Sequence, residues 1–343
     1  NTGTDFSTGG NWGGGIAPTD DSTTDFASFG TAATNLPVLA ANRSVHGLIF
    51  ATGAGAFTFS ATGGALLTLG AGGIAQQDNS TQTLDASLSL TLGAAAAFTT
   101  TSTGALTINS AVDNGGHLLT LSASSTGAGT VSGTIDGAGG LTKSGGNTWT
   151  LSGSNSFTGA TTVTGGTLAI TSVADGGTNS SLGAATNAAA NLVLDGGSLR
   201  FTGTTAQTTD RLFTLGLGGG TLDASGSTGN TLGLTNTGAI DLDGSGTRTL
   251  TLTGTNTGAN TLAATLSDNG GATSVTKTGT GAWLLSGANS HTGTTTLSAG
   301  TLTLGDDNAL GTGTLALNGG TLNANAPRTI ANAITLGGNA AIG

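Results

Sequence analysis

The feature that most constrains the fold is an internal duplication. Residues 137–170 (GAGGLTKSGGNTWTLSGSNSFTGATTVTGGTLAI) recur at residues 271–304 (GATSVTKTGTGAWLLSGANSHTGTTTLSAGTLTL), where a constant shift of 134 residues gives 18 identities in 34 positions. The identities include both lysines of the chain and two of its three tryptophans. A stack of repeated units accommodates such a duplication by growing longer, whereas a closed barrel must change its strand number or its shear. The duplication therefore favours a stacked architecture.

The local pattern between and around the copies is that of short β-strands. Runs such as AFTFSA, LSLTLG and LTLTGT alternate apolar residues with Thr or Ser, and glycine-rich turns separate them. Such alternation places one kind of side chain on each face of a strand. The 64 glycines disfavour helices, since a glycine in a helix interior costs about 1 kcal/mol relative to alanine. The chain is expected to be all-β.

We predict a right-handed parallel β-helix, or β-solenoid, over residues 35–343. Three short strands per rung imply on the order of a dozen rungs, with Leu, Val and Ile inside and Thr and Ser in outward ladders. An antiparallel sandwich or barrel is the alternative for evenly spaced short strands. Residues 1–34 lack clear alternation, and we expect them to form a cap on the first rung or an arm that leaves its own chain.

Charge and composition argue against nucleic-acid binding, a membrane-spanning helix and disulfide bonds. The net charge is −10 with only seven Lys and Arg residues, so no basic stripe can neutralise the phosphates of a nucleic acid. The sequence contains no apolar run near the roughly 18 residues that a transmembrane helix requires. Cysteine is absent, which excludes a disulfide framework.

The duplicated aromatic and basic residues are expected to serve the repeat itself. Because Trp149 and Trp283 hold equivalent places, a packing role is favoured over carbohydrate stacking, and each lysine is expected to lie over the neighbouring rung. His291 stands where the first copy has Phe157, so we place it on a half-buried wall. The other two histidines, at positions 46 and 117, have no spacing that would make them joint metal ligands.

Both copies resemble a known family repeat, the autotransporter-associated β-strand repeat. A lysine, a leucine, a Gly-x-Asn pair and a closing Gly-Thr-Leu carry the resemblance, at Lys143, Leu151, Gly153, Asn155 and 166–168, and at Lys277, Leu285, Gly287, Asn289 and 300–302. Gly146, Thr280 and His291 depart from the simplest form of the motif. The resemblance implies a secreted bacterial surface protein built as a parallel β-helix, in which the repeat serves passenger folding and export rather than catalysis.

The sequence contains only weak candidates for catalytic or metal-binding residues. Three close pairs of carboxylates occur: Asp20 with Asp21, Asp306 with Asp307, and Asp241 with Asp243. Only the last pair has the spacing that puts both side chains on one face of a strand, and its nearest basic residue is Arg248. The run DLDGSG at residues 241–246 matches half of a calcium loop, for which a solvated turn is the favoured interpretation. We therefore predict no catalytic, cofactor-binding or metal-binding residues.

The function expected from the sequence is structural. With 7% charged residues the surface repels itself weakly, and neither terminal segment shows a helix-forming or charge-rich cap that would block strand addition. The leading expectation is a non-enzymatic extracellular protein that assembles end to end with copies of itself into a filament or surface layer. The alternatives are a passenger that acts as an adhesin or stalk, binding a host or a glycan, and a polysaccharide-active β-helix enzyme.

Overall fold

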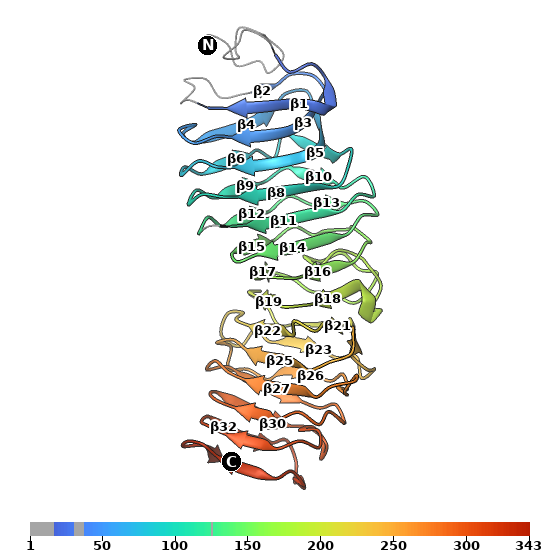
Figure 1. Cartoon of the computed structure of the whole chain (residues 1–343), viewed down its shortest axis with the longest axis vertical. Coiled ribbons are helices and arrows are strands. Elements are labelled where there is room, and N and C mark those ends of the chain that lie inside the picture. The colour runs from blue at the N-terminus through green and yellow to red at the C-terminus, as the bar shows by residue number, and fades with distance from the viewer. Residues whose placement is uncertain (1–16, 31–37, 125) are drawn as a thin grey trace. The chain divides into compact units, whose positions relative to one another are not determined.

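The chain forms two compact units, each of which is a parallel β-solenoid (Figure 1). The computed structural model describes residues 17–30, 38–124 and 126–343. The first unit ends at residue 159 and also takes in residues 179–184, while the second comprises residues 160–178 and 185–343. Together the described residues make about 14 turns, close to the predicted dozen. The prediction of an all-β parallel solenoid is confirmed, and the described chain has a single short 3-10 turn, Ala189–Asn191, besides its strands.

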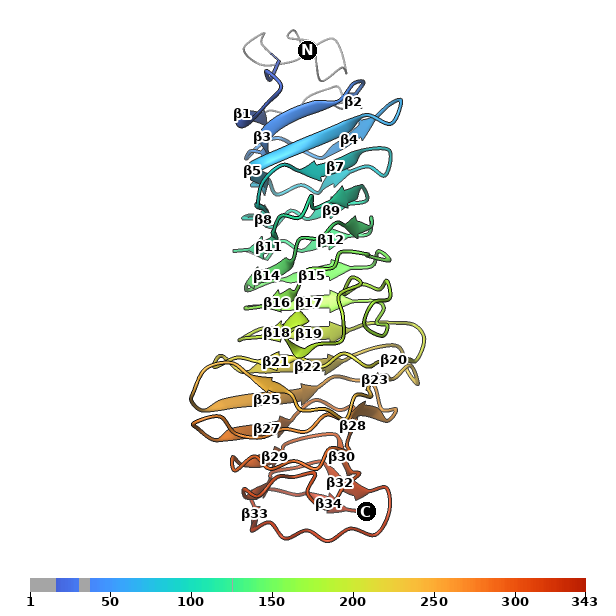
Figure 2. The same ribbon diagram turned by 90° about the vertical axis from the view of Figure 1, so that its right-hand side faces the viewer.

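The first unit holds strands β1 to β15, which Figure 2 shows from the side. Their bounds are β1 (Asp21–Phe29), β2 (Val38–Leu39), β3 (Arg43–Phe50), β4 (Phe57–Ala61), β5 (Leu66–Gln76), β6 (Gln82–Leu84), β7 (Ser89–Leu92), β8 (Ala96–Thr100), β9 (Leu106–Ile108), β10 (Ala111–Asp113), β11 (Leu119–Ala123), β12 (Gly129–Val131), β13 (Ile135–Asp136), β14 (Leu141–Gly145) and β15 (Thr148–Leu151). Two successive turns contribute three strands each, since β8, β9 and β10 are followed by β11, β12 and β13.

The register of strand pairing in the first unit aligns residues of the same kind in columns along the stack. On one face Thr58, Thr83, Thr107, Thr130 and Thr150 are paired in succession and form an outward threonine ladder. The positions beside them point inward and are buried, and on β4, β6 and β9 they are apolar except for Gln82. In the earliest turns the core is aromatic, because the ring of Phe29 lies against those of Phe50, Phe57 and Phe59, and Phe50 also lies against Phe57. The alternation read from the sequence therefore separates core from surface as expected.

The second unit holds strands β16 to β34. Their bounds are β16 (Thr161–Val163), β17 (Thr167–Ile170), β18 (Leu192–Leu194), β19 (Ser198–Phe201), β20 (Gln207–Thr209), β21 (Thr214–Leu215), β22 (Gly220–Ala224), β23 (Leu232–Leu234), β24 (Asp241–Leu242), β25 (Arg248–Thr253), β26 (Asn260–Leu262), β27 (Thr273–Lys277), β28 (Ala282–Leu285), β29 (Thr295–Leu297), β30 (Thr301–Leu304), β31 (Leu315–Leu317), β32 (Thr321–Ala324), β33 (Ile334–Leu336) and β34 (Ala341–Ile342).

Two long columns of strands run through the second unit. One follows the order β17, β19, β22, β25, β27, β29, β31, β33, and the other β20, β23, β26, β28, β30, β32, β34. Thr221, Thr251, Thr276 and Thr296 form the outward ladder of the first column. Because strands such as β27 pair with the turns before and after them, the ladder supplies partners for most of their backbone groups.

The N-terminal segment contributes at least one strand to the first unit. Strand β1 pairs in parallel with β3, which in turn pairs with β5. The predicted cap or arm spans residues 1–34, of which residues 1–16 and 31–34 lie outside the described residues. That expectation therefore stays a prediction.

Candidate functional site

The two lysines of the duplicated segments point into the core. Lys143 on β14 is paired with Leu121, and Lys277 on β27 is paired with Leu252 and Leu297, so each occupies a column of inward-facing apolar residues. Both lysines are fully buried. The expected position over the neighbouring turn is met only in part, because the stems lie inside the solenoid rather than along its surface.

Backbone carbonyl groups, rather than carboxylates, hold each ammonium group. Lys277 Nζ donates to the carbonyl oxygens of Thr278 at 2.5 Å, Gly279 at 3.0 Å and Ala299 at 3.1 Å. Lys143 Nζ donates likewise to the carbonyl oxygens of the next two residues, at 2.7 and 2.9 Å. Gly145 and Gly279 have φ values of 71° and 65°, a left-handed conformation that glycine adopts without strain. Each glycine thus forms the corner whose carbonyl group accepts from the lysine two residues before it.

Burial changes the acidity of both lysines. Desolvation of the charged form lowers the pKa of Lys143 and that of Lys277 to about 8 from the ordinary 10.5. An amine with this pKa is partly neutral in mildly alkaline solution. The hydrogen bonds to carbonyl groups still give the charged form a place in the core.

The duplicated tryptophans are core residues. Trp149 and Trp283 are fully buried, and each indole Nε1 donates to a carbonyl group of the preceding turn, Ser122 at 3.1 Å and Thr253 at 2.8 Å. The ring of Trp149 lies so close to Gly129 that an added Cβ would come within 2.2 Å of it. The packing role is confirmed, and these buried rings present no face on which a sugar could stack.

The asparagines of the repeat connect neighbouring turns through side-chain hydrogen bonds to the backbone, and we call each of them a staple. The sequence alone did not predict this role. Asn155 accepts from the backbone N–H of Ile135 at 2.8 Å and donates to the carbonyl group of Ser181 at 2.9 Å. Asn289 does the same, accepting from Leu266 N–H at 2.8 Å and donating to the carbonyl group of Ala309 at 2.6 Å. Each buried amide therefore links the preceding turn to the following one. Its recurrence six residues after the tryptophan was the available signal.

His291 is fully buried, so the expectation of a half-buried wall is wrong. The physical reason is that it fills the core position held by Phe157, where a glycine of the next turn, Gly311, makes room for the ring. Its Nε2 lies 3.2 Å from the hydroxyl group of Thr295. Burial lowers the pKa of His291, which the nearby carboxylate of Asp268 partly opposes. The second copy is thus the more polar of the two.

The carboxylate pairs singled out from the sequence have different surroundings. Asp241 and Asp243 are exposed, and the neighbouring Arg248 is buried and donates to backbone carbonyl groups, including that of Asp243 at 2.8 Å. In the other two pairs, Asp20 pairs with Arg43 and Asp306 accepts from a backbone N–H two residues on. Across residues 17–30, 38–124 and 126–343, no group of three or more His, Asp or Glu residues comes together as a metal site.

The two remaining histidines occupy different surroundings. His46 packs edge-on against Phe26 with ring centroids 4.8 Å apart, and its Nδ1 lies 3.1 Å from the carbonyl oxygen of Ser22. His117 lies in the turn between β10 and β11, where its backbone N–H donates to Asn114. In the part of the chain that the structure describes, no helix is long and apolar enough to cross a membrane.

Comparison with known proteins identifies the repeat. The family model of the passenger-associated-transport-repeat matches residues 141–170 and 275–304. These ranges contain the lysine, tryptophan and asparagine of each copy, whose shared geometry is described above. Searches of curated proteins and of solved structures gave no significant match. The chain therefore carries two passenger-associated-transport-repeats on a parallel β-solenoid, a combination that is consistent with an autotransporter passenger repeat protein.

Proposed function

We propose that the chain is a non-enzymatic structural part of a bacterial surface protein, and that it associates end to end with copies of itself. The repeat and the solenoid fold fit an autotransporter passenger, and the repeat belongs to secreted passenger proteins, which indicates an extracellular or surface location. The lysine, tryptophan and asparagine that recur in the two copies are buried and bond to the backbone, as expected for a structural role.

One observation carries the self-association. The last strands of the second unit leave inward-column residues open to solvent: Leu336 is 77% exposed and Ile342 is 73% exposed. They pair with Leu317 and Leu322, which the stack buries. A further turn laid on β33 and β34 would bury them in the same way, and each such side chain contributes about 1.5–3 kcal/mol when fully buried.

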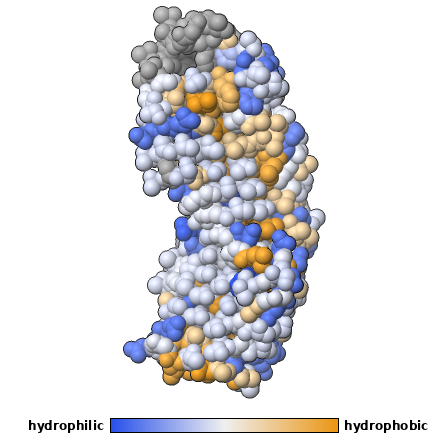
Figure 3. Space-filling view, viewed as in Figure 1, coloured by the Kyte–Doolittle hydropathy of each residue, from blue (hydrophilic) through white to orange (hydrophobic). Residues whose placement is uncertain are grey.

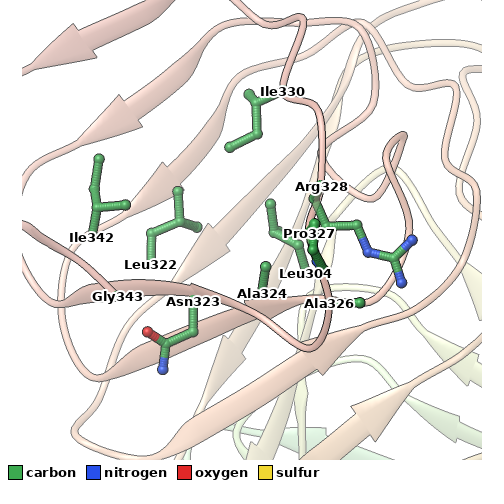
Figure 4. Close-up of a pocket in the computed structure, with 10 residues that line it drawn as sticks. All are labelled: Leu304, Leu322, Asn323, Ala324, Ala326, Pro327, Arg328, Ile330, Ile342 and Gly343. Atoms are coloured by element: carbon green, nitrogen blue, oxygen red, sulfur yellow. The ribbon is translucent and has the colours of Figure 1, made fainter.

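The surface around this end favours such an addition. Figure 3 shows hydrophobic surface gathered at the end of the second unit. Beside it lies an opening of about 390 Å³, in which Leu304, Leu322, Ile330 and Ile342 surround the space and Arg328 lies at its side (Figure 4). Strands β33 and β34 also present backbone groups that can template another strand. We assign this place to a second copy of the chain, with the continuation of the same polypeptide as the competing occupant.

Sedimentation velocity over a range of protein concentrations tests the assignment. The wild-type chain is expected to form concentration-dependent oligomers, visible as filaments by electron microscopy, and the double variant L336D/I342D is expected to remain monomeric. Leu217 is 51% exposed elsewhere in the second unit, so L217D is the matched control and should assemble as the wild type does. Monomers at every concentration, or equal loss of assembly in L217D, would refute end-to-end association.

The second candidate is a passenger that acts as an adhesin or stalk, favoured by the matched repeats. In that case the open end is covered by the chain's own continuation. A longer polypeptide that includes the residues encoded after Gly343 would then be monomeric, and L336D/I342D would destabilise it without changing its oligomeric state. Release of new reducing ends or unsaturated products from a panel of glycans would contradict the non-enzymatic part of the proposal.

A further inference from the structure

A polar groove crosses the outer face of the second unit, outside both repeat segments for most of its length. It has a volume of about 510 Å³ and is lined by side chains of β19, β22 and β25 and by the loops that follow them, namely Arg200, Thr202, Asp223, Ser225, Thr253 and Thr255. Arg200, Asp223 and Thr253 are paired in succession, so the groove runs along a single outward column. Neighbouring turns are about 4.8 Å apart, and four of them span roughly 14 Å.

Glycines keep one part of the groove free of side chains. Gly254 and Gly279 both line it, and both have positive φ values, 119° and 65°. A Cβ atom at Gly254 would also lie only 2.1 Å from the carbonyl oxygen of Ala224 in the turn below. Any larger residue is therefore disfavoured there, and a hollow stays open beside Thr253 and Thr255.

The groove contains a positioned arginine. Arg200 Nε donates to Asp223 Oδ2 at 2.6 Å, and the other carboxylate oxygen of Asp223 accepts from the hydroxyl group of Ser225. The side chain of Asp223 is 7% exposed, whereas that of Arg200 is 40% exposed. Both oxygens of the buried carboxylate are thus in use, and they fix the direction of the guanidinium group.

The far end of that guanidinium group is available to a ligand. Among the residues that the structure describes, none provides a hydrogen-bond acceptor for the two terminal nitrogens of Arg200. A guanidinium group in this state binds a carboxylate through two parallel hydrogen bonds. The hydroxyl groups of Thr253 and Thr255 lie along the same groove and suit the hydroxyl groups of a sugar.

We propose that this groove binds a glycan chain that carries carboxylate groups, with a uronate carboxylate on Arg200 and neighbouring sugar hydroxyl groups on the threonines. The groove has no aromatic residue in its lining, so the carboxylate contact supplies most of the selectivity. The site is independent of the open end of the solenoid, and its occupation does not require self-association.

Isothermal titration calorimetry at low ionic strength tests the proposal, with oligogalacturonate as the probe and its methyl ester as the neutral counterpart. The wild-type chain should bind the acid and not the ester. R200K keeps the charge but removes the planar fork, and it should weaken binding about tenfold or more. R43K is the matched control, because Arg43 is also paired with an aspartate, Asp20 at 2.8 Å, and it should bind as the wild type does.

A second variant guards against a loss of binding through misfolding. Thr255 is exposed and takes no part in the ion pair of Arg200, so T255W should block the groove while leaving the unfolding midpoint near that of the wild type. Absence of binding by the wild type, equal binding of acid and ester, equal losses in R200K and R43K, or full binding by T255W would each overturn the assignment.

Discussion

The buried lysines make the stability of this protein depend on alkaline pH in an unusual direction. The pKa of each is about 8 in the folded chain and has its ordinary value of 10.5 when the chain unfolds. Between these values the unfolded chain binds more protons than the folded one, so the free energy of unfolding rises with pH. Below pH 8 both states are protonated and the slope vanishes.

The size of the effect follows from the shift. A difference of about 2.5 pKa units corresponds to roughly 3 kcal/mol for each lysine, as an upper bound that is reached above pH 10.5. Few other groups contribute to the pH dependence in this range, because the chain has no tyrosine and no cysteine. Apart from the terminal amino group, the two lysines are the groups whose ordinary titration falls in the alkaline window.

Urea unfolding followed by tryptophan fluorescence measures the effect. Trp149 and Trp283 are buried one in each unit, so W149F and W283F in a W12F background report on the two units separately. The midpoint should rise between pH 8 and pH 10.5 in both cases. In K143M/K277M the rise should disappear. A midpoint that stays flat or falls in the wild type, or an unchanged rise in the double methionine variant, would refute the assignment of the shifted pKa values to the lysines.

Three further predictions concern the repeat. N155A or N289A should lower the free energy of unfolding by about 2–5 kcal/mol in urea, because each leaves a buried N–H and a buried carbonyl group without partners; an effect below 0.5 kcal/mol would contradict the staple. G129A should lower the thermal midpoint because its Cβ would overlap the ring of Trp149, and combining it with W149F should recover part of the loss. Burial lowers the pKa of His291, so its contribution to the free energy of unfolding is complete above about pH 6.5 and should be lost as the pH falls below that value. In H291F the free energy of unfolding should fall less steeply with decreasing pH. Equal pH dependence in the two proteins would argue against His291 as the cause.

The sequence was sufficient for the fold because its information is periodic. Alternation, glycine-rich turns and the duplication each point to stacked short strands, and the structure confirms that fold. The burial of Trp149 and Trp283 was predicted for the same reason, since equivalent places in two copies imply a shared structural role. The expected partial exposure of His291 was wrong. The backbone of the repeat places this position in the core, so it is buried whether Phe157 or His291 occupies it.

The polar contacts between turns could not be predicted without the register of strand pairing. Arg200 and Asp223 lie 23 residues apart, and turn lengths vary along the chain, so the sequence could not place them side by side. The bonds from Lys277 to carbonyl groups were equally hidden, because backbone acceptors carry no signature in the sequence. Only the recurrence of the donors themselves was visible.

The asparagine and the tryptophan of each repeat donate across turns to main-chain carbonyl groups, and so does Lys277 in the second copy. Any neighbouring segment supplies such groups, whatever its side chains are. A copied repeat therefore finds these hydrogen-bond partners at a new place, although a tryptophan ring such as that of Trp149 also needs room beside it, which Gly129 provides. The use of main-chain partners offers a physical reason why the same repeat can occur twice in one chain.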